Sequence, residues 1–327
     1  MYRPPFSITS EMIQRSLSIA AKAERFSSYQ SLRRMPTLRR NNRIESLHSS
    51  LAIEANSLSL GQVRDVIDGK TVIGPKKEIQ EVKNAYDAYS RIDRFDPYDE
   101  NDLLEAHGIL TRFLETESGV YRAHGEGVRD EIGNVIHIAP SERMVPTLMK
   151  QLFAWLREDE ETPLLIKSCV FHYEFVFIHP FGDGNGRTAR LWQTALLAKW
   201  NPLFAYIPIE SRIYACQSDY YAAIAASNHA GDSTAFIEFM LKMIDEALDE
   251  TLVGAGQEAK SISEQVSRLL DVLEPDIPLS ANEIMKRLGV KSKETLRASY
   301  LNPAIENGLV KMTLPDKPKS KNQKYYK

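Results

Sequence analysis

Hydrophobic positions recur at helical spacing along most of the chain. In residues 42–62, Ile44, Leu47, Leu51 and Leu58 fall three, four and seven residues apart, which places them on one face of a helix. The same kind of spacing predicts further helices at residues 9–26, 103–114, 145–157, 164–177, 187–199, 218–227 and 233–252. The pattern therefore predicts a mainly α protein.

One stretch breaks this helical pattern. In residues 119–140, apolar Val128 and the run VIHI at 135–138 lie on either side of Gly133-Asn134. Short apolar runs that flank a glycine-containing turn are typical of a β-hairpin. We therefore expect a hairpin at about residues 127–139.

The last part of the chain differs in charge and in pattern. Residues 261–327 carry a net charge of +4, against −7 for residues 1–260. The segment GAGQEAK at 254–260 is expected to be a flexible joint between them. Beyond it, three helical stretches precede a strand signal at GLVKMTLP and a basic return segment, which is the order of a winged helix-turn-helix. Such a domain binds DNA or a protein, and the sequence leaves both open.

Length, net charge and cysteine content limit the kinds of protein that this chain can be. The 327 residues are enough for two or three domains, and 43% hydrophobic residues are enough for a sizeable core. The net charge of −3 excludes a global basic field for nucleic acid or anionic membranes. There is no apolar run of about 18 residues, and the first ten residues lack the apolar core of a signal peptide. With only Cys169 and Cys216, we expect a cytoplasmic protein without a membrane partner.

The most informative segment is HPFGDGNGRTAR, residues 179–190, between two apolar helical stretches. A glycine-rich turn before a helix exposes backbone N–H groups, which bind anions. Arg187 and Arg190 share a helix face near this turn, and guanidinium groups suit phosphate oxygens. Asp183 offers a hard oxygen ligand for Mg²⁺, and His179 a group that can act as a general base. The segment therefore predicts a site for nucleotide phosphates with a base beside it.

Two common nucleotide motifs do not fit this segment. It is not a Walker loop, because no Gly-Lys-Ser/Thr follows the glycines. It is not a dinucleotide fingerprint, because a helix precedes it rather than a strand. The segment is instead similar to the signature of the Fic family, His-Pro-Phe-x-Asp/Glu-Gly-Asn-Gly-Arg-x-x-Arg, at every fixed position.

The resemblance implies a fold and an activity. It extends from the expected hairpin to about Asp249 and implies a Fic helical core with the hairpin as its flap. Fic proteins mostly transfer AMP from ATP to a hydroxyl side chain of a target protein. The resemblance therefore implies a protein adenylyltransferase that uses ATP and Mg²⁺ and modifies a Ser, Thr or Tyr of its target, and also itself.

The resemblance also implies a role for each motif residue. His179 would take the proton from the target hydroxyl, and Asp183 would hold Mg²⁺ against the α- and β-phosphates. Tyr221 and Asn228 fall where the family contacts the nucleoside. The phosphate contacts would come from the turn and the start of the next helix, with the γ-phosphate on the second arginine: Gly184, Asn185, Gly186, Arg187 and Arg190.

A second motif, SLAIEANS at residues 50–57, lies in a helical stretch at about 44–60. It resembles the inhibitory motif of the family, Ser/Thr-x-x-x-Glu-Gly/Asn. Ser50 and Glu54 fit the spacing, whereas Ala55 departs from the Gly/Asn preference. By resemblance, Glu54 would pair with Arg190 and occupy the place of the γ-phosphate, so that ATP would bind unproductively. We call residues 50–57 the inhibitory segment.

Together these signals divide the chain into an N-terminal helical region (1–98), a Fic domain (99–253) and a winged-helix domain (261–327). A target protein would dock on the flap at 127–139, and the chain could form a homodimer. Two other interpretations stay open beside adenylyl transfer. One is a DNA-binding regulator whose Fic core only senses nucleotide, and the other is a Fic enzyme that removes AMP or transfers UMP or a phosphoryl group.

Overall fold

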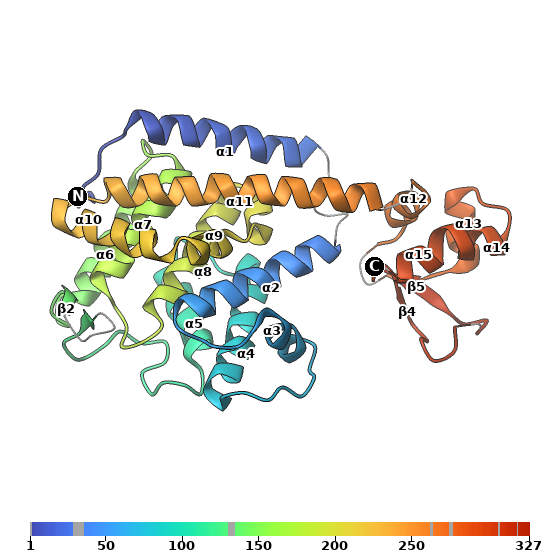
Figure 1. Ribbon diagram of the computed structural model, residues 1–327, viewed down its shortest axis with the longest axis horizontal. Coiled ribbons are helices and arrows are strands. Elements are labelled where there is room, and N and C mark those ends of the chain that lie inside the picture. The colour runs from blue at the N-terminus through green and yellow to red at the C-terminus, as the bar shows by residue number, and fades with distance from the viewer. Residues whose placement is uncertain are drawn as a thin grey trace. The chain divides into compact units, whose positions relative to one another are not determined.

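The computed structural model describes most of the chain and divides it into two compact units (Figure 1). The first unit comprises Met1–Glu24 and Asn42–Asp249, and the second comprises Arg25–Asn41 and Glu250–Lys327. Each unit has its own hydrophobic core. The residues that the structure describes are 2–28, 36–129, 135–261, 264–274, 277–306, 308–318 and 320–327.

Two helices form the centre of the first unit. α7 spans Leu164–Ile178 and α8 spans Asn185–Trp200, and they pack against each other. Both helices are largely buried, which explains why most residues of α7 are apolar on every face. The turn between them carries HPFGDGNGRTAR, so the predicted site lies where two buried helices meet.

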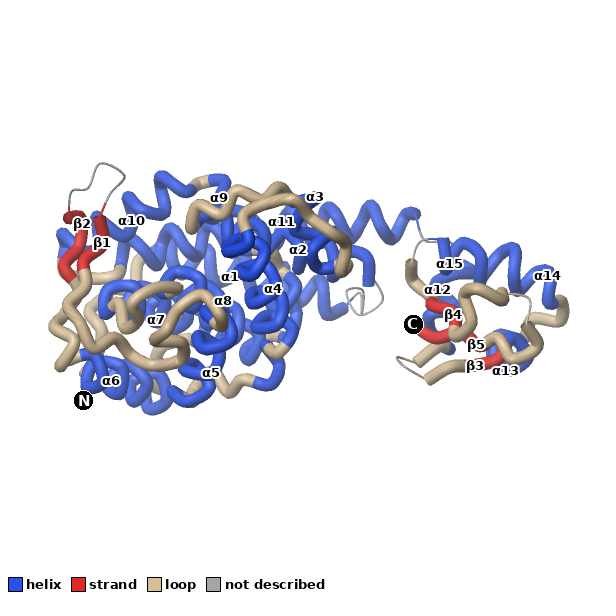
Figure 2. The backbone as a smooth tube through the Cα atoms, turned by 90° about the horizontal axis from the view of Figure 1, so that it is seen from below, coloured by secondary structure: helices blue, strands red, loops and turns tan. Residues whose placement is uncertain are grey.

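The other helices up to residue 261 surround this pair or flank it (Figures 1 and 2). The prediction of a mainly α protein is confirmed, and no described helix combines the length and the apolar character that crossing a membrane requires. These helices are α1 (Ser10–Ser28), α2 (Pro36–Ile53), α3 (Leu60–Ile67), α4 (Lys76–Ser90), α5 (Glu100–Thr111), α6 (Val145–Glu158), α9 (Ile209–Ala215), α10 (Gln217–Ala230) and α11 (Thr234–Ser261), with short 3₁₀ turns at Ile92–Arg94 and Pro202–Tyr206.

The structure corrects the single helix expected at residues 42–62. α2 ends at Ile53, because Ala55 adopts a left-handed conformation with φ 64° that a helix cannot contain. A new helix, α3, then begins after Ser59. Ser59 accepts a hydrogen bond from the backbone N–H of Gln62, and the Gln62 side chain accepts one in return from the Ser59 backbone. The inhibitory segment therefore lies across a helix end and the turn that follows it.

The flexible joint expected at residues 254–260 is also wrong. α11 continues without a break to Ser261. The segment contains two glycines, each of which costs a helix about 1 kcal/mol, but its other residues are Ala, Gln, Glu and Lys, which are among the best helix formers. Two glycines in such a segment therefore do not indicate flexibility.

The expected hairpin is present. β1 (Gly127–Arg129) pairs antiparallel with β2 (Val135–Ile138), with Gly127 opposite Ile138 and a register shift after Val128. Figure 2 shows this pair at one end of the first unit. The predicted turn at Gly133-Asn134 lies outside the described residues.

The second unit combines short helices with a small sheet. The sheet is antiparallel in the order β3-β5-β4, and Leu269, Ile284, Leu296 and Tyr325 lie in the core beneath it. The helical stretches and the two later strands follow the predicted order, whereas β3, between the first and second helices, is not predicted. The winged-helix assignment and its DNA or protein partner stay predictions. The elements are α12 (Glu264–Val272), β3 (Leu279–Ser280), α13 (Ala281–Leu288), α14 (Lys293–Thr295), a π-helical turn (Leu296–Leu301), α15 (Asn302–Glu306), β4 (Lys311–Met312) and β5 (Lys324–Tyr326).

Candidate active site

Arg122, which lies outside the turn between α7 and α8, holds the backbone of that turn. His179 ends α7 in a left-handed conformation with φ 52°, and its side chain is half-buried. Arg122, from the segment before the hairpin, donates from its guanidinium Nε to the carbonyl of His179 at 2.7 Å. The backbone N–H of Arg122 donates to the carbonyl of Pro180 at 2.9 Å. The histidine is thus fixed at a sharp bend.

A second set of contacts fixes the middle of the turn. The Asn185 side chain accepts a hydrogen bond from the N–H of Phe181 at 2.9 Å and donates one to its carbonyl at 2.8 Å. The buried ring of Phe181 stacks on His107 of α5, with 3.6 Å between ring centroids. The side chain of Asn185 therefore holds the backbone of the turn at Phe181.

His107 connects α5 to the turn. Its Nδ1 accepts a hydrogen bond from the N–H of Gly119 at 3.0 Å, and its Nε2 lies 2.9 Å from the carbonyl of Asp183. Burial lowers the pKa of His107 to about 4, so the ring is neutral at physiological pH. A neutral ring that accepts at Nδ1 carries its proton on Nε2, which therefore donates to Asp183. His107 is a structural histidine that holds the turn.

The start of α8 forms an anion-binding site. Gly184 precedes the helix with φ 80°, and a Cβ there would come 3.0 Å from the Thr111 side chain, so the position requires glycine. The N–H groups in the first turn of α8 have no partner within the helix. They add the positive end of the helix dipole to the site.

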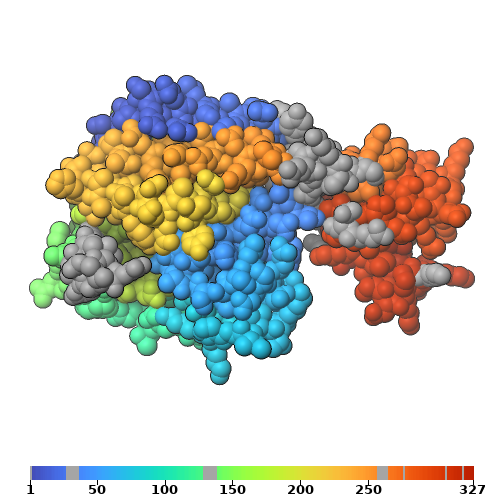
Figure 3. All heavy atoms as spheres, in the orientation of Figure 1, coloured from blue at the N-terminus to red at the C-terminus, as the bar shows by residue number. Residues whose placement is uncertain are grey.

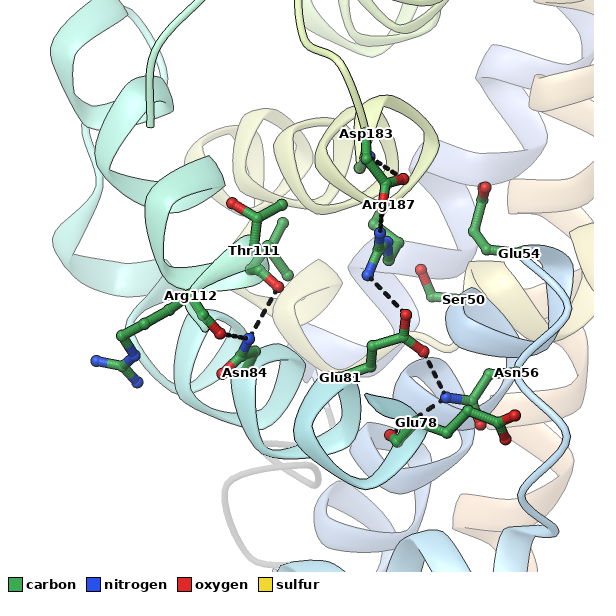
Figure 4. Close-up of polar contacts among 12 residues, drawn as sticks. Ser50, Glu54, Asn56, Glu78, Glu81, Asn84, Thr111, Arg112, Asp183 and Arg187 are labelled. Carbon is green, nitrogen blue, oxygen red and sulfur yellow. Dashed lines mark hydrogen bonds and ion pairs between the residues drawn. The ribbon is translucent and has the colours of Figure 1, made fainter. Parts of the chain in front are cut away.

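Arg187 lies at this helix start between two carboxylates (Figure 4). Its guanidinium donates to Asp183 Oδ2 at 3.1 Å and lies 3.6 Å from Glu81 Oε1 of α4. Burial acts to raise the pKa of Asp183, but the charge of Arg187 and the hydrogen bond from the Gly184 N–H outweigh it and lower the pKa. Asp183 is therefore an ionised carboxylate at physiological pH.

Arg190, one turn further along α8, is paired with the inhibitory segment. It donates to the hydroxyl of Ser50 at 3.0 Å, to the carbonyl of Ser50 at 2.9 Å and to Glu54 Oε1 at 2.8 Å. Burial acts to lower the pKa of Arg190, but the Glu54 carboxylate outweighs it and raises the pKa, so the guanidinium stays charged. A Cβ added at Gly186 would collide with Glu54 Oε1. Glu54 thus lies directly over the first turn of α8.

Further contacts hold the inhibitory segment in this place. The carbonyl of Ile53, at the end of α2, accepts hydrogen bonds from Gln217 at 3.1 Å and from the Tyr221 hydroxyl at 3.5 Å, both on α10. Figure 3 shows side chains of α10, in yellow, meeting those of the blue N-terminal helices on one face of the first unit. Ala55 occupies the left-handed position next to Glu54, which explains why the motif prefers Gly or Asn there.

The structure brings most of the predicted residues together, and Asn228 lies about two turns further along α10 than Tyr221. The turn residues, the two arginines and Glu54 lie within one site, and Tyr221 borders it through its contact with Ile53. Asn228 is instead engaged with α7, where it accepts a hydrogen bond from the Tyr173 hydroxyl at 2.9 Å.

Sequence reasoning missed several residues that shape the site. Glu81, Arg122 and Gln217 all contact it from segments distant in sequence. The helical spacing of Val82, Ala85 and Tyr89 could have revealed α4, but no local signal pairs a glutamate on that helix with Arg187.

Comparisons with known proteins agree with this geometry. Residues 97–197 match the model of the Fic/DOC family, and residues 264–326 match that of the C-terminal domain of Filamentation induced by cAMP protein Fic-like. The crystal structure of a Fic family protein from Desulfovibrio desulfuricans G20 is 43% identical, covers 99% of this chain and 98% of its own, and superposes with a TM-score of 0.76.

Two curated relatives are more distant. Protein adenylyltransferase fic-1 of Caenorhabditis elegans is 27% identical over 216 residues, which are 64% of this chain and 41% of the relative. Protein adenylyltransferase Fic of Nematostella vectensis is 28% identical over 219 residues, which are 64% of this chain and 48% of the relative. The matched region therefore spans less than half the length of either. The near-complete match to the Desulfovibrio protein, together with the site geometry, shows that this chain belongs to the Fic family.

Proposed function

We propose that this chain transfers AMP from ATP to a hydroxyl group of a target protein, and that it can also modify itself. The observation that carries the proposal is the position of Glu54, whose carboxylate lies over the first turn of α8 beside Arg190. The place already holds an anion, and the N–H groups and arginines around it suit the phosphates of a nucleotide. The two relatives named protein adenylyltransferase support the same reaction.

In this reaction the target hydroxyl oxygen forms a bond to the α-phosphorus while the bond from that phosphorus to the pyrophosphate oxygen breaks. Pyrophosphate leaves with the electron pair, and the hydroxyl proton passes to the imidazole of His179. A base in this position contributes roughly 10²–10⁴-fold to the rate. Arg187 and Arg190 hold the β- and γ-phosphates, so the chain's main contribution is to position the groups and stabilise charge.

Asp183 is the residue that would hold Mg²⁺. It is ionised, and Mg²⁺ is commonly bound by one or two carboxylates together with the phosphates of its nucleotide and several waters. Among the described residues no group of three or more His, Cys, Asp or Glu side chains is arranged so that it could hold a metal ion. When bound there, the ion neutralises charge on the phosphates. We assign the nucleoside to the surface near Tyr221 and Asn228.

The same contacts support autoinhibition. Glu54 and the γ-phosphate would compete for Arg190, because both are anions and the guanidinium already uses two hydrogen bonds on Ser50. With Glu54 in place, a nucleotide would bind with its phosphates displaced from the productive line of attack. Ser50 would keep Arg190 oriented when Glu54 leaves.

The target is proposed to dock along the hairpin. An extended peptide can add a strand to a sheet edge through main-chain hydrogen bonds, which places a hydroxyl with little demand on sequence. The hairpin is connected to the catalytic turn, because Arg122 also donates to the carbonyls of His124 and Pro140, on either side of the two strands, at 2.7 and 2.6 Å. A docked segment would thus be positioned relative to His179.

The test is labelling with α-³²P-ATP and MgCl₂ of two purified variants, Glu54→Gly and the double variant Glu54→Gly/His179→Ala. We expect the single variant to acquire label and the double variant to lose it by roughly 10²–10⁴-fold, because the proton acceptor is gone. ATP binding, measured by calorimetry, should persist in both. Equal labelling of the two variants would refute the role of His179.

A further inference from the structure

Arg187 occupies an electrostatically unfavourable position. It lies in the first turn of α8, where the positive end of the helix dipole repels a cation, and only 5% of its side chain is exposed. A buried charge in such a place needs counter-ions. The structure supplies two, Asp183 from the preceding turn and Glu81 from α4, and Figure 4 shows Arg187 between them.

Glu81 is itself held in a fixed orientation. Its side chain is 13% exposed, and its two oxygens have different partners. Oε1 faces Arg187 at 3.6 Å, while Oε2 accepts a hydrogen bond from the Asn56 side chain at 2.8 Å. Asn56 also donates to the backbone carbonyl of Glu78 at 3.3 Å and accepts from the N–H of Leu58 at 3.2 Å. Glu81 therefore connects the inhibitory segment to a phosphate-binding arginine.

The helix that carries Glu81 is fixed relative to the catalytic turn. Asn84, one turn along α4, is buried and donates to the carbonyls of Leu110 and Arg112 at 3.1 and 2.7 Å, at the end of α5. α5 also carries His107, which holds the backbone of Asp183. The two carboxylates on either side of Arg187 thus belong to one connected framework, although they come from different elements.

We propose that Glu81 is a positioning residue for Arg187 and that it leaves Asp183 free to bind a metal–nucleotide complex. The proposal rests on the proposed nucleotide site. When Asp183 turns to a divalent cation, its hydrogen bond with Arg187 weakens, and Glu81 is the counter-ion that remains. Without Glu81, the arginine would keep Asp183 as its partner, and the cation would have to compete with it.

The test measures ATP binding by calorimetry as a function of MgCl₂ concentration. All variants carry Glu54→Gly, so that Glu54 does not contribute. Adding Glu81→Gln removes the charge but keeps the size of the side chain, and the Mg²⁺ concentration needed for half-maximal binding should rise about tenfold, as is typical when a group supporting a metal ligand is lost. With EDTA in place of Mg²⁺, the same substitution should not weaken ATP binding.

Glu78→Gln is the matched control. Glu78 lies on the same helix and contacts the same segment, since it accepts hydrogen bonds from the backbone N–H and the hydroxyl of Ser57, but it does not face Arg187. Its loss should change the Mg²⁺ dependence by less than about twofold. Asn56→Ala, which frees one side of Glu81, should shift the Mg²⁺ dependence in the same direction as Glu81→Gln and by a smaller amount.

The outcomes separate this proposal from the proposed function. Equal Mg²⁺ dependence in the Glu81→Gln and Glu78→Gln variants would overturn the role of Glu81, and so would tighter Mg²⁺-dependent binding in Glu81→Gln. If the Glu54→Gly variant binds ATP with Mg²⁺ but acquires no label, the proposed transfer fails while the binding comparison still decides the role of Glu81. Equal melting temperatures of the variants would show that the substitutions leave the fold intact.

Discussion

Arg187 and Arg190 lie three residues apart on one helix, yet their counter-ions come from regions of different character. Glu81 lies inside α4, a continuous helix fixed to α5 by Asn84. Glu54 lies on the turn after α2, next to a strained residue, and its side chain is 36% exposed against 13% for Glu81. The difference indicates that Glu81 is a permanent counter-ion of Arg187, whereas Glu54 is a counter-ion of Arg190 that can be displaced.

The comparison of the two counter-ions suggests how the start of α8 can be covered by Glu54 and still be arranged to bind phosphates. If Arg190 also had a permanent partner, the γ-phosphate would have to compete with that partner for the guanidinium. If both arginines had removable partners, two buried guanidinium groups would lose their orientation whenever the site opened. Under the proposed function, a permanent partner for Arg187 and a displaceable partner for Arg190 keep the site ordered before a nucleotide binds.

Removing Glu54, the displaceable partner of Arg190, should have the largest effect on labelling. In Glu54→Gly, Arg190 keeps its two hydrogen bonds to Ser50 and gains room for a phosphate. We expect labelling with α-³²P-ATP to rise roughly 5- to 150-fold, the range of a typical coupling energy between sites. Labelling that stays at the wild-type level, with nucleotide binding intact, would mean that Glu54 does not restrain the reaction.

A substitution at Ala55, the residue next to Glu54, should have a smaller effect on labelling. Ala55→Gly relieves the left-handed strain of about 1 kcal/mol and stabilises the turn that places Glu54 over α8. Autoinhibition should tighten, and labelling of an otherwise wild-type chain should fall about fivefold, again within the usual range of coupling energies. The matched control is the same substitution in the Glu54→Gly background, where we expect no change. Higher labelling in the single variant would contradict this account of the turn.

The sequence could predict the residues that lie in one contiguous segment. Residues 179–190 contain the glycines, the carboxylate proposed to hold Mg²⁺ and both arginines, so their proximity follows from the chain itself. The sequence also indicates Glu54 through its similarity to the inhibitory motif, and Glu54 pairs with Arg190 as that resemblance implies. The sequence does not predict the break in the helix after Ile53, because the spacing of apolar residues continues past it and gives no sign of the left-handed Ala55.

The rest of the site depends on tertiary packing. Glu81 and Arg122 reach the turn from segments far away in sequence, and each is a common charged residue on an ordinary amphipathic or irregular stretch. Nothing in their local pattern distinguishes them from solvated surface residues. Likewise, the resemblance implies that Asn185 forms part of the anion hole, and only the folded turn reveals that its side chain holds the backbone of Phe181.

The central claim is that the first turn of α8 binds the phosphates of a nucleotide in the place that Glu54 occupies. The most direct test is a crystal structure of the Glu54→Gly variant with MgCl₂ and a non-hydrolysable ATP analogue. The account predicts phosphates on the N–H groups of the first turn, the γ-phosphate on Arg190, and the α-phosphate facing His179. A nucleotide bound elsewhere, with Arg190 still turned away from it, would contradict the account.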